Sequence, residues 1–147
     1  MKAAEVALAI FLLAQGEQAF PKLTAQHAPS GCISLVGAAP TVTAEGRLAV
    51  RSFAGPPNYQ SVASGDAEER AFILELSRSA CIDDGGNFAD PSERLATVHV
   101  SATDSALLAV LRASVGREVI ITGEGFASHS GHHHAPLVII ACSITVR

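Results

Sequence analysis

Apolar and polar residues alternate along residues 40–53, with the two-residue period of a β-strand that has one wet face. The middle of this segment holds Gly46, which lacks a Cβ and so permits the bend or bulge that a strongly coiled barrel strand needs. A similar period predicts two further strands, at residues 70–77 and 95–101.

The hydrophobic period changes to that of an α-helix over residues 104–115. Four apolar residues share one helical face there: Leu107, Leu108, Leu111 and Val115. Either Thr103 or Asp104 can serve as the N-cap, and Gly116 suits the C′ position that ends a helix.

Two apolar strands close the chain, at residues 118–126 and 137–146. The element order is therefore β-β-β-α-β-β. This order, with a glycine-bent first strand, is that of the OB-fold, a five-stranded Greek-key barrel. We predict a mainly β, small five-stranded OB-fold-like barrel; the alternative is another small α+β domain with a similar set of elements.

The first twenty residues are typical of an export signal. Lys2 gives a positive charge, and residues 6–14 form an apolar run that is too short to span a membrane. The alternative is an N-terminal amphipathic helix, which the abrupt polar end of the run disfavours. We therefore expect a protein of the periplasm, or one secreted, with three parts: a signal peptide at 1–19, a spacer at 20–39 and the barrel domain at 40–147.

The overall charge argues against a nucleic-acid partner. The net charge is -4, and aromatic residues make up only 5% of the chain. Proteins that bind nucleic acid normally present a basic stripe. We also expect no membrane span once the signal peptide has been removed.

Three cysteines in an exported chain suggest one disulfide and one free thiol. Cys32 precedes the first barrel strand and Cys81 follows the second, so an antiparallel hairpin brings the two to the same end. We predict that they form the disulfide. Cys142 alternates in phase with the apolar residues of the last strand, and we expect it to be buried and inert.

Four histidines gather between the last two strands, at His129, His132, His133 and His134. Alternate side chains of an extended segment share a face, so His132 and His134 can point together, and His129 can join them across a turn. Neutral imidazoles suit zinc or copper. The alternatives are a loop whose histidines bind the backbone, metal uptake only in vitro, and a protonation switch near neutral pH.

A second conspicuous feature is the proline-stiffened loop that carries Tyr59, the only tyrosine. An amphipathic ring on a stiff loop is a reasonable recognition element, although it can equally pack on the barrel rim. We take Tyr59, Asn58, Asp66 and His133 as candidate ligand-binding residues. The acidic residues of the loops, Glu69 among them, are expected to be solvated charges, and we find no catalytic constellation.

Three stretches of the chain resemble an uncharacterised bacterial family, the domain of unknown function 4431. They are residues 53–59 with Gly65 and Asp66, residues 81–83, and residues 131–134 with Pro136. The resemblance extends over residues 32–146 and implies a small exported protein without an established activity. The chain departs from the family pattern at Ala135, where a hydroxyl residue is expected, and in having Cys142.

These observations favour an exported, periplasmic, non-enzymatic binding or inhibitor module. Its partner is expected to be a protein, a glycan or a small ligand, bound by the barrel face and its two long loops. The alternative is a periplasmic metal-binding protein that uses His129, His132 and His134 for zinc or copper.

Overall fold

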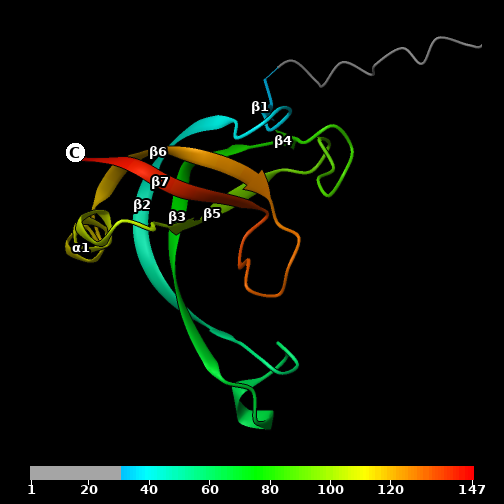
Figure 1. The fold of residues 1–147 in the computed structure, drawn as a ribbon, viewed down its shortest axis with the longest axis vertical. Coiled ribbons are helices and arrows are strands. Elements are labelled where there is room, and N and C mark those ends of the chain that lie inside the picture. The colour runs from blue at the N-terminus through cyan, green and yellow to red at the C-terminus, as the bar shows by residue number, and fades with distance from the viewer. Residues whose placement is uncertain (1–30) are drawn as a thin grey trace, which may run out of the picture.

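The computed structural model of the protein describes residues 31–147 and shows a closed five-stranded β-barrel with one helix (Figure 1). The expected signal peptide at 1–19, and residues 20–30 of the expected spacer, lie outside the described residues. The elements are β1 Ile33–Ser34, β2 Thr41–Ala54, η1 Val62–Ser64, β3 Glu68–Ala80, β4 Ile82–Asp83, β5 Leu95–Ser101, α1 Ser105–Ala113, β6 Glu118–Ala127 and β7 Leu137–Val146. No helix within residues 31–147 is long and apolar enough to cross a membrane.

The barrel has the topology that the sequence predicts. Going round it, the strands follow the order β2, β3, β5, β7 and β6, and β6 pairs with β2 to close the ring. Only the β5–β7 pair is parallel among these barrel pairings. This strand order, with the helix between the third and fourth barrel strands, is that of the OB-fold, so the predicted fold class is confirmed.

Strand β2 closes the barrel because it pairs with both β3 and β6, and the two pairings overlap at Gly46. This residue pairs with Leu76 of β3 on one side and with Val119 of β6 on the other. A Cβ at Gly46 would lie 2.0 Å from the carbonyl oxygen of Glu75, so only glycine allows the two strands to approach this closely. Both pairings include Gly46 without a register shift, so the glycine serves this close approach and not a bulge.

The interior is filled by aliphatic side chains that alternate along the strands. The largest fully buried side chains of this core are Leu48, Leu74, Leu111, Ile121, Leu137 and Ile139. Leu111 comes from α1, which packs against β7 at one end of the barrel (Figure 1). Asp104 is the N-cap, and its carboxylate accepts a hydrogen bond from the backbone N–H of Leu107 at 2.9 Å.

The helix and strand β3 differ most from their predicted bounds, and β3 also ends later than expected, at Ala80. The helix ends at Ala113 with Ser114 as its C-cap, so Gly116, which has a φ of 85°, lies two residues beyond the cap and is not C′. Strand β3 runs from Glu68 to Ala80 and so begins earlier than expected. The reason is the ladder with β2, which pairs Phe53 with Glu69 and continues over polar residues.

Cys142 is exposed, so its predicted burial is wrong. A register shift between Thr122 and Gly123 of β6 makes Cys142 the extra residue of a β-bulge, because Thr122 pairs with Ser143 and Gly123 with Ala141. The inward face of β7 therefore changes phase along the strand. It carries Leu137, Ile139 and Ala141 before the bulge, and Ile144 and Val146 pack on the core after it.

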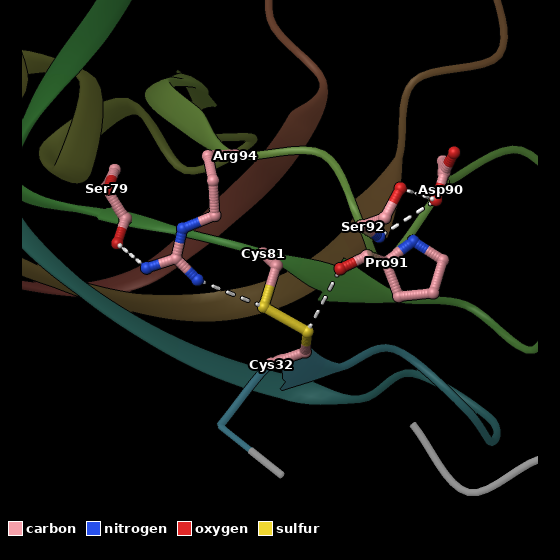
Figure 2. Close-up of a disulfide and its surroundings, with 7 residues drawn as sticks. All are labelled: Cys32, Ser79, Cys81, Asp90, Pro91, Ser92 and Arg94. Carbon is pink, nitrogen blue, oxygen red and sulfur yellow. Dashed lines mark hydrogen bonds between the residues drawn. A yellow bond between two sulfur atoms is a disulfide. The ribbon is translucent and has the colours of Figure 1, made fainter. Parts of the chain in front are cut away.

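The predicted disulfide is confirmed: Cys32 is bonded to Cys81 (Figure 2). Directly after these cysteines, β1 and β4 form a short parallel pair in which Ile33 lies opposite Ile82. The sequence pattern did not reveal these two-residue strands. The disulfide thus fastens the segment that precedes the barrel to the loop that follows β3.

Candidate functional site

The candidate site lies on the outward face of the barrel, where one row of side chains crosses five strands. Strand pairing places these residues side by side, in the order Ala49, Ile73, His99, Val138 and Phe126. Ile73 is only 1% exposed and Val138 only 3%, although both point away from the barrel interior. Another part of the chain must therefore cover them.

The covering segment is the connection between β6 and β7, residues 128–136, which we call the His loop. The imidazole of His134 stacks on Phe53, with ring centroids 4.1 Å apart and planes within 1° of parallel, and it also lies 5.5 Å from the ring of His99. At the other edge, His133 meets Phe126 edge to face at 5.2 Å. The His loop is thus packed onto the sheet face.

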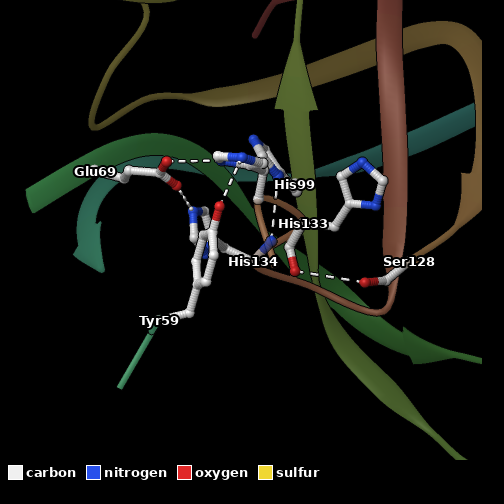
Figure 3. A network of polar contacts seen from close by, with 7 residues as sticks. Tyr59, Glu69, His99, Ser128, His133 and His134 are labelled. Carbon is white, nitrogen blue, oxygen red and sulfur yellow. Dashed lines mark hydrogen bonds and ion pairs between the residues drawn. The ribbon is translucent and has the colours of Figure 1, made fainter. Parts of the chain in front are cut away.

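Glu69 joins the His loop to β3. Its carboxylate accepts hydrogen bonds from His132 Nδ1 at 2.7 Å and from His134 Nε2 at 3.0 Å (Figure 3). Burial alone raises the pKa of Glu69, but the hydrogen bonds and charges of His134 and His132 outweigh it, so the pKa lies below its ordinary value. Glu69 is therefore an ionised acceptor at neutral pH.

Tyr59 extends this network from the opposite loop. Its hydroxyl is hydrogen-bonded to His132 Nε2 at 2.8 Å, and its ring lies against Gly131, where an added Cβ would come within 3.0 Å of ring carbons. Because Nδ1 of His132 faces a carboxylate, which only accepts, Nε2 of the neutral imidazole accepts the Tyr59 O–H. These two hydrogen bonds fix the tautomer of His132 and the orientation of its ring, although the side chain is 60% exposed.

His99 supports the His loop from beneath. Its Nδ1 accepts the backbone N–H of His134 at 3.3 Å, which requires an unprotonated nitrogen (Figure 3). Burial lowers the pKa of His99 to about 4, and the imidazoles of His134 and His133 lower it as well, against the opposing charge of Glu69. His99 is thus a neutral hydrogen-bond acceptor on the outward face, beneath the His loop.

The remaining two histidines hold the beginning of the His loop. His133 Nδ1 accepts the backbone N–H of His129 at 3.1 Å, and His129 Nδ1 donates to the carbonyl of Ala127 at 3.1 Å. Burial lowers the pKa of His133, and the imidazoles of His129, His132 and His134 add to this effect. His133 thus bonds the loop's own backbone, and His129 bonds the last residue of β6.

The proposed metal ligands are not brought together as a set of three. The structure joins His132 and His134 at Glu69 and places His129 with His133 instead. Within residues 31–147 no group of three or more histidine, cysteine or acidic side chains is arranged to hold a metal ion. The geometry agrees better with the alternative interpretation, in which the histidines hold the shape of the loop.

The loop that carries Tyr59, residues 55–67, is organised by Asp66. The Asp66 carboxylate accepts the backbone N–H groups of Ser61, Gln60 and Asn58 at 2.8 to 2.9 Å, and the Asn58 side-chain amide at 3.1 Å. These backbone hydrogen bonds lower the pKa of Asp66 to about 2. Asp66 is buried, so it shapes the Tyr59 loop from within, whereas Asn58, which it bonds, is exposed.

Sequence reasoning singled out Tyr59 and the histidines, but missed Glu69 and Phe53. Glu69 was expected to be a solvated loop charge, yet it lies in β3 opposite Phe53, and both contact His134. Glu69, Ala71 and Ile73 are alternate residues of β3, so they share its outward face. Extending that alternation backwards is the signal that could have placed Glu69 beside the His loop.

The fold and the site define an OB-fold barrel whose outward face is covered by the loop between its last two strands. Residues 97–145 match the model of a family described as a domain of unknown function (DUF4431). The predicted resemblance is confirmed over this stretch, which runs from β5 into β7 and includes the whole His loop.

No curated protein matches the chain in sequence. Among solved structures, the chain is similar to the small single-stranded DNA-binding protein from Streptomyces coelicolor, with 17% identity and a TM-score of 0.35. The alignment covers 74% of this chain and 95% of that protein.

Proposed function

We propose that this chain is an exported, non-enzymatic binding protein that holds a protein partner with the surface shared by the Tyr59 loop and the His loop. The observation that carries the proposal is the contact between Tyr59 and His132, which joins the two loops at 2.8 Å. In OB-folds these are the two loops that flank the ligand-binding face. This comparison with other OB-folds is an analogy. Its chemical support is the exposed ring of His132, which a partner can contact.

The chemistry of this surface favours a protein partner. Tyrosine is enriched in protein interfaces because its ring supplies a large contact area and its hydroxyl a hydrogen bond. Tyr59 and His132 are held by Gly131 and Glu69, so little conformational freedom is lost when a partner binds. The chain's net charge of -4 makes a nucleic acid an unfavourable partner.

The compartment that we propose rests on two features of the chain. The apolar run at residues 6–14 has the length of a signal-peptide core, and the Cys32–Cys81 disulfide forms in an oxidising compartment. We therefore propose the periplasm, and a partner that is exported to the same place. An inhibitor of an exported enzyme is one form that such a module can take.

The test is a capture experiment followed by titration. The chain purified from the periplasm is immobilised and exposed to periplasmic extract, and each captured protein is then purified and titrated against wild type and variants. We expect Tyr59→Ala and His132→Ala each to weaken binding by about tenfold or more, as for a central interface residue.

The matched control is Arg112→Ala, at an exposed position of α1. This variant should bind as wild type does, and urea unfolding verifies that all three variants are folded. Equal binding by wild type, Tyr59→Ala and His132→Ala would show that this surface is not the binding site.

A further inference from the structure

A small pocket lies beside the His loop, between it and the loop that follows the disulfide. Its volume is about 100 Å³, and its apolar lining includes the buried Ile82 and Leu95 and the exposed Pro136. Phe88, Asp90 and Glu93 also line it. Pockets that bind ligands are commonly lined by apolar side chains with a few polar groups that set specificity.

Phe88 is the most conspicuous of these residues because it is 70% exposed. Its position is fixed by Asp84, whose carboxylate accepts the backbone N–H groups of Phe88 at 2.7 Å and of three neighbouring residues, Gly86, Asn87 and Ala89, at 3.0 to 3.2 Å. The tight turn before it uses Gly85 and Gly86 at positive φ, of 78° and 82°. The loop therefore presents an exposed aromatic ring on an ordered backbone. Little conformational entropy of the loop is lost when a partner covers the ring.

The rim of the pocket is negatively charged. Asp90 and Glu93 line it and are exposed, and hydrogen bonds from Ser92 lower the pKa of Asp90, so its carboxylate is ionised at neutral pH. Arg94 is the cation among the lining residues, but its guanidinium donates to the Ser79 carbonyl at 3.0 Å and lies 3.5 Å from the Cys81 sulfur (Figure 2).

We propose that this pocket receives an arginine side chain of the protein partner. The aliphatic stem of the arginine lies on the apolar lining, and its guanidinium stacks on Phe88 and binds the carboxylates of Asp90 and Glu93. Arginine fits better than lysine because its planar head can stack on a ring and bond a carboxylate at the same time.

The inference rests on the proposed function, since the pocket continues the same surface. Ser128 and Pro136, near the two ends of the His loop, both line the pocket. The ring of His129, from the His loop, lies 5.5 Å from that of Phe88. One partner can therefore cover Tyr59, the His loop and Phe88 together.

The test is an NMR titration of the ¹⁵N-labelled chain at pH 8 with the blocked tripeptide acetyl-Gly-Arg-Gly-amide, up to about 20 mM because a single side chain binds weakly. The comparison peptide carries citrulline, which has the shape of arginine without its charge. We expect the arginine peptide to shift the amide signals of Phe88, Ala89 and Leu95, and to bind at least about fivefold more tightly than the citrulline peptide.

Phe88→Ala and the double variant Asp90→Asn/Glu93→Gln should each weaken this binding by about fivefold or more. The matched control is Glu118→Gln, which removes an exposed carboxylate from β6. The proposal is overturned by any of three outcomes: no shift at Phe88 over the whole titration, equal binding of the citrulline peptide, or an equal loss in the Glu118→Gln control.

The two proposals can fail separately. If a captured partner depends on Tyr59 and His132 but binds Phe88→Ala as well as wild type, the arginine pocket is wrong and the binding surface stands. If the arginine peptide shifts the Phe88 signals while no captured protein depends on Tyr59 or His132, the proposed function is wrong and the pocket stands.

Discussion

Gly46 is the residue on which closure of the barrel depends, because a Cβ there would meet backbone and not a flexible side chain. We expect Gly46→Ala to lower the free energy of unfolding by about 3 kcal/mol or more, since the Glu75 carbonyl cannot move without breaking the ladder. Urea unfolding measures this. Thr41→Ala, at an exposed position of the same strand, is the control and should change stability by less than about 0.5 kcal/mol.

His99 makes stability depend on pH. A histidine in the unfolded chain titrates near 6.5, and the pKa of His99 in the folded chain is about 4. Between these values the unfolded chain binds a proton that the folded chain does not, so the free energy of unfolding falls as the pH drops from 6.5 towards 4. His133, whose pKa is also lowered, acts in the same direction, and Glu69 adds a loss below its ordinary pKa of 4.5.

We expect the His99 contribution to be about 1 to 2 kcal/mol after allowance for solvent screening. Urea unfolding at pH 7.5 and pH 5 measures the total, and NMR titration of the imidazole signals reports the pKa of His99. His99→Asn keeps an acceptor for the His134 backbone N–H but does not titrate, so its stability should depend less on pH. A His99 pKa near 6.5 would contradict the burial argument.

At the scale of elements, the hydrophobic period was sufficient to predict the five barrel strands and the helix. Strands β5 and β7 have the expected bounds because alternation is a local property that each segment carries in its own residues. The predicted phase of β7 was wrong up to Cys142, because the bulge there arises from pairing with β6 and could not be read from the strand itself. Residues Leu137, Ile139 and Ala141 face the core before the bulge, and the predicted Ile144 and Val146 pack on the core after it. The early start of β3 was missed for a similar reason, since pairing with β2 keeps polar residues in the strand.

The candidate site was predicted only in part. As for the strands, the prediction failed where a contact depends on residues far apart in the sequence. Tyr59 and the His loop stood out because they are unusual in this sequence. Glu69, which joins the His loop to β3, is separated from His132 by 63 positions, so nothing near either residue in the sequence pairs them. Which histidines share a partner depends on these long-range contacts, which bring His132 and His134, not His129, to Glu69.

This arrangement of the His loop leads to a prediction about metal binding. Both ring nitrogens of His132 are engaged, Nδ1 by Glu69 and Nε2 by Tyr59, so a metal ion could use His132 only by breaking a contact that holds the loop. His129 is bonded to Ala127 and is not brought to Glu69 with His132 and His134. We expect the change of all three to alanine to reduce zinc or copper affinity by less than about tenfold.

Equilibrium dialysis of the tag-free chain against each metal measures this. Circular dichroism and urea unfolding establish whether the triple variant keeps its fold. A larger loss of affinity in a folded variant would support the alternative function, a periplasmic metal-binding protein that uses these histidines.

For the whole molecule, the disulfide connects export, stability and the surface proposed for binding. It ties residues 49 positions apart, and it fastens the loop that carries Phe88 at its beginning, where β4 follows Cys81 directly. A crosslink over a loop of this length restricts the unfolded chain substantially. A chain kept in a reducing compartment would lose that restriction.

We therefore expect Cys32→Ser/Cys81→Ser to lower the free energy of unfolding by about 2 to 4 kcal/mol, and a reductant to have a similar effect on the wild type. Urea unfolding with and without reductant measures both. Cys142→Ser is the matched control, because Cys142 is an exposed free thiol, and it should unfold as wild type does. A wild type that is indifferent to reductant would mean that the barrel alone supplies the stability. In that case the disulfide would no longer support the argument for an oxidising compartment, and export would rest on the N-terminal sequence alone.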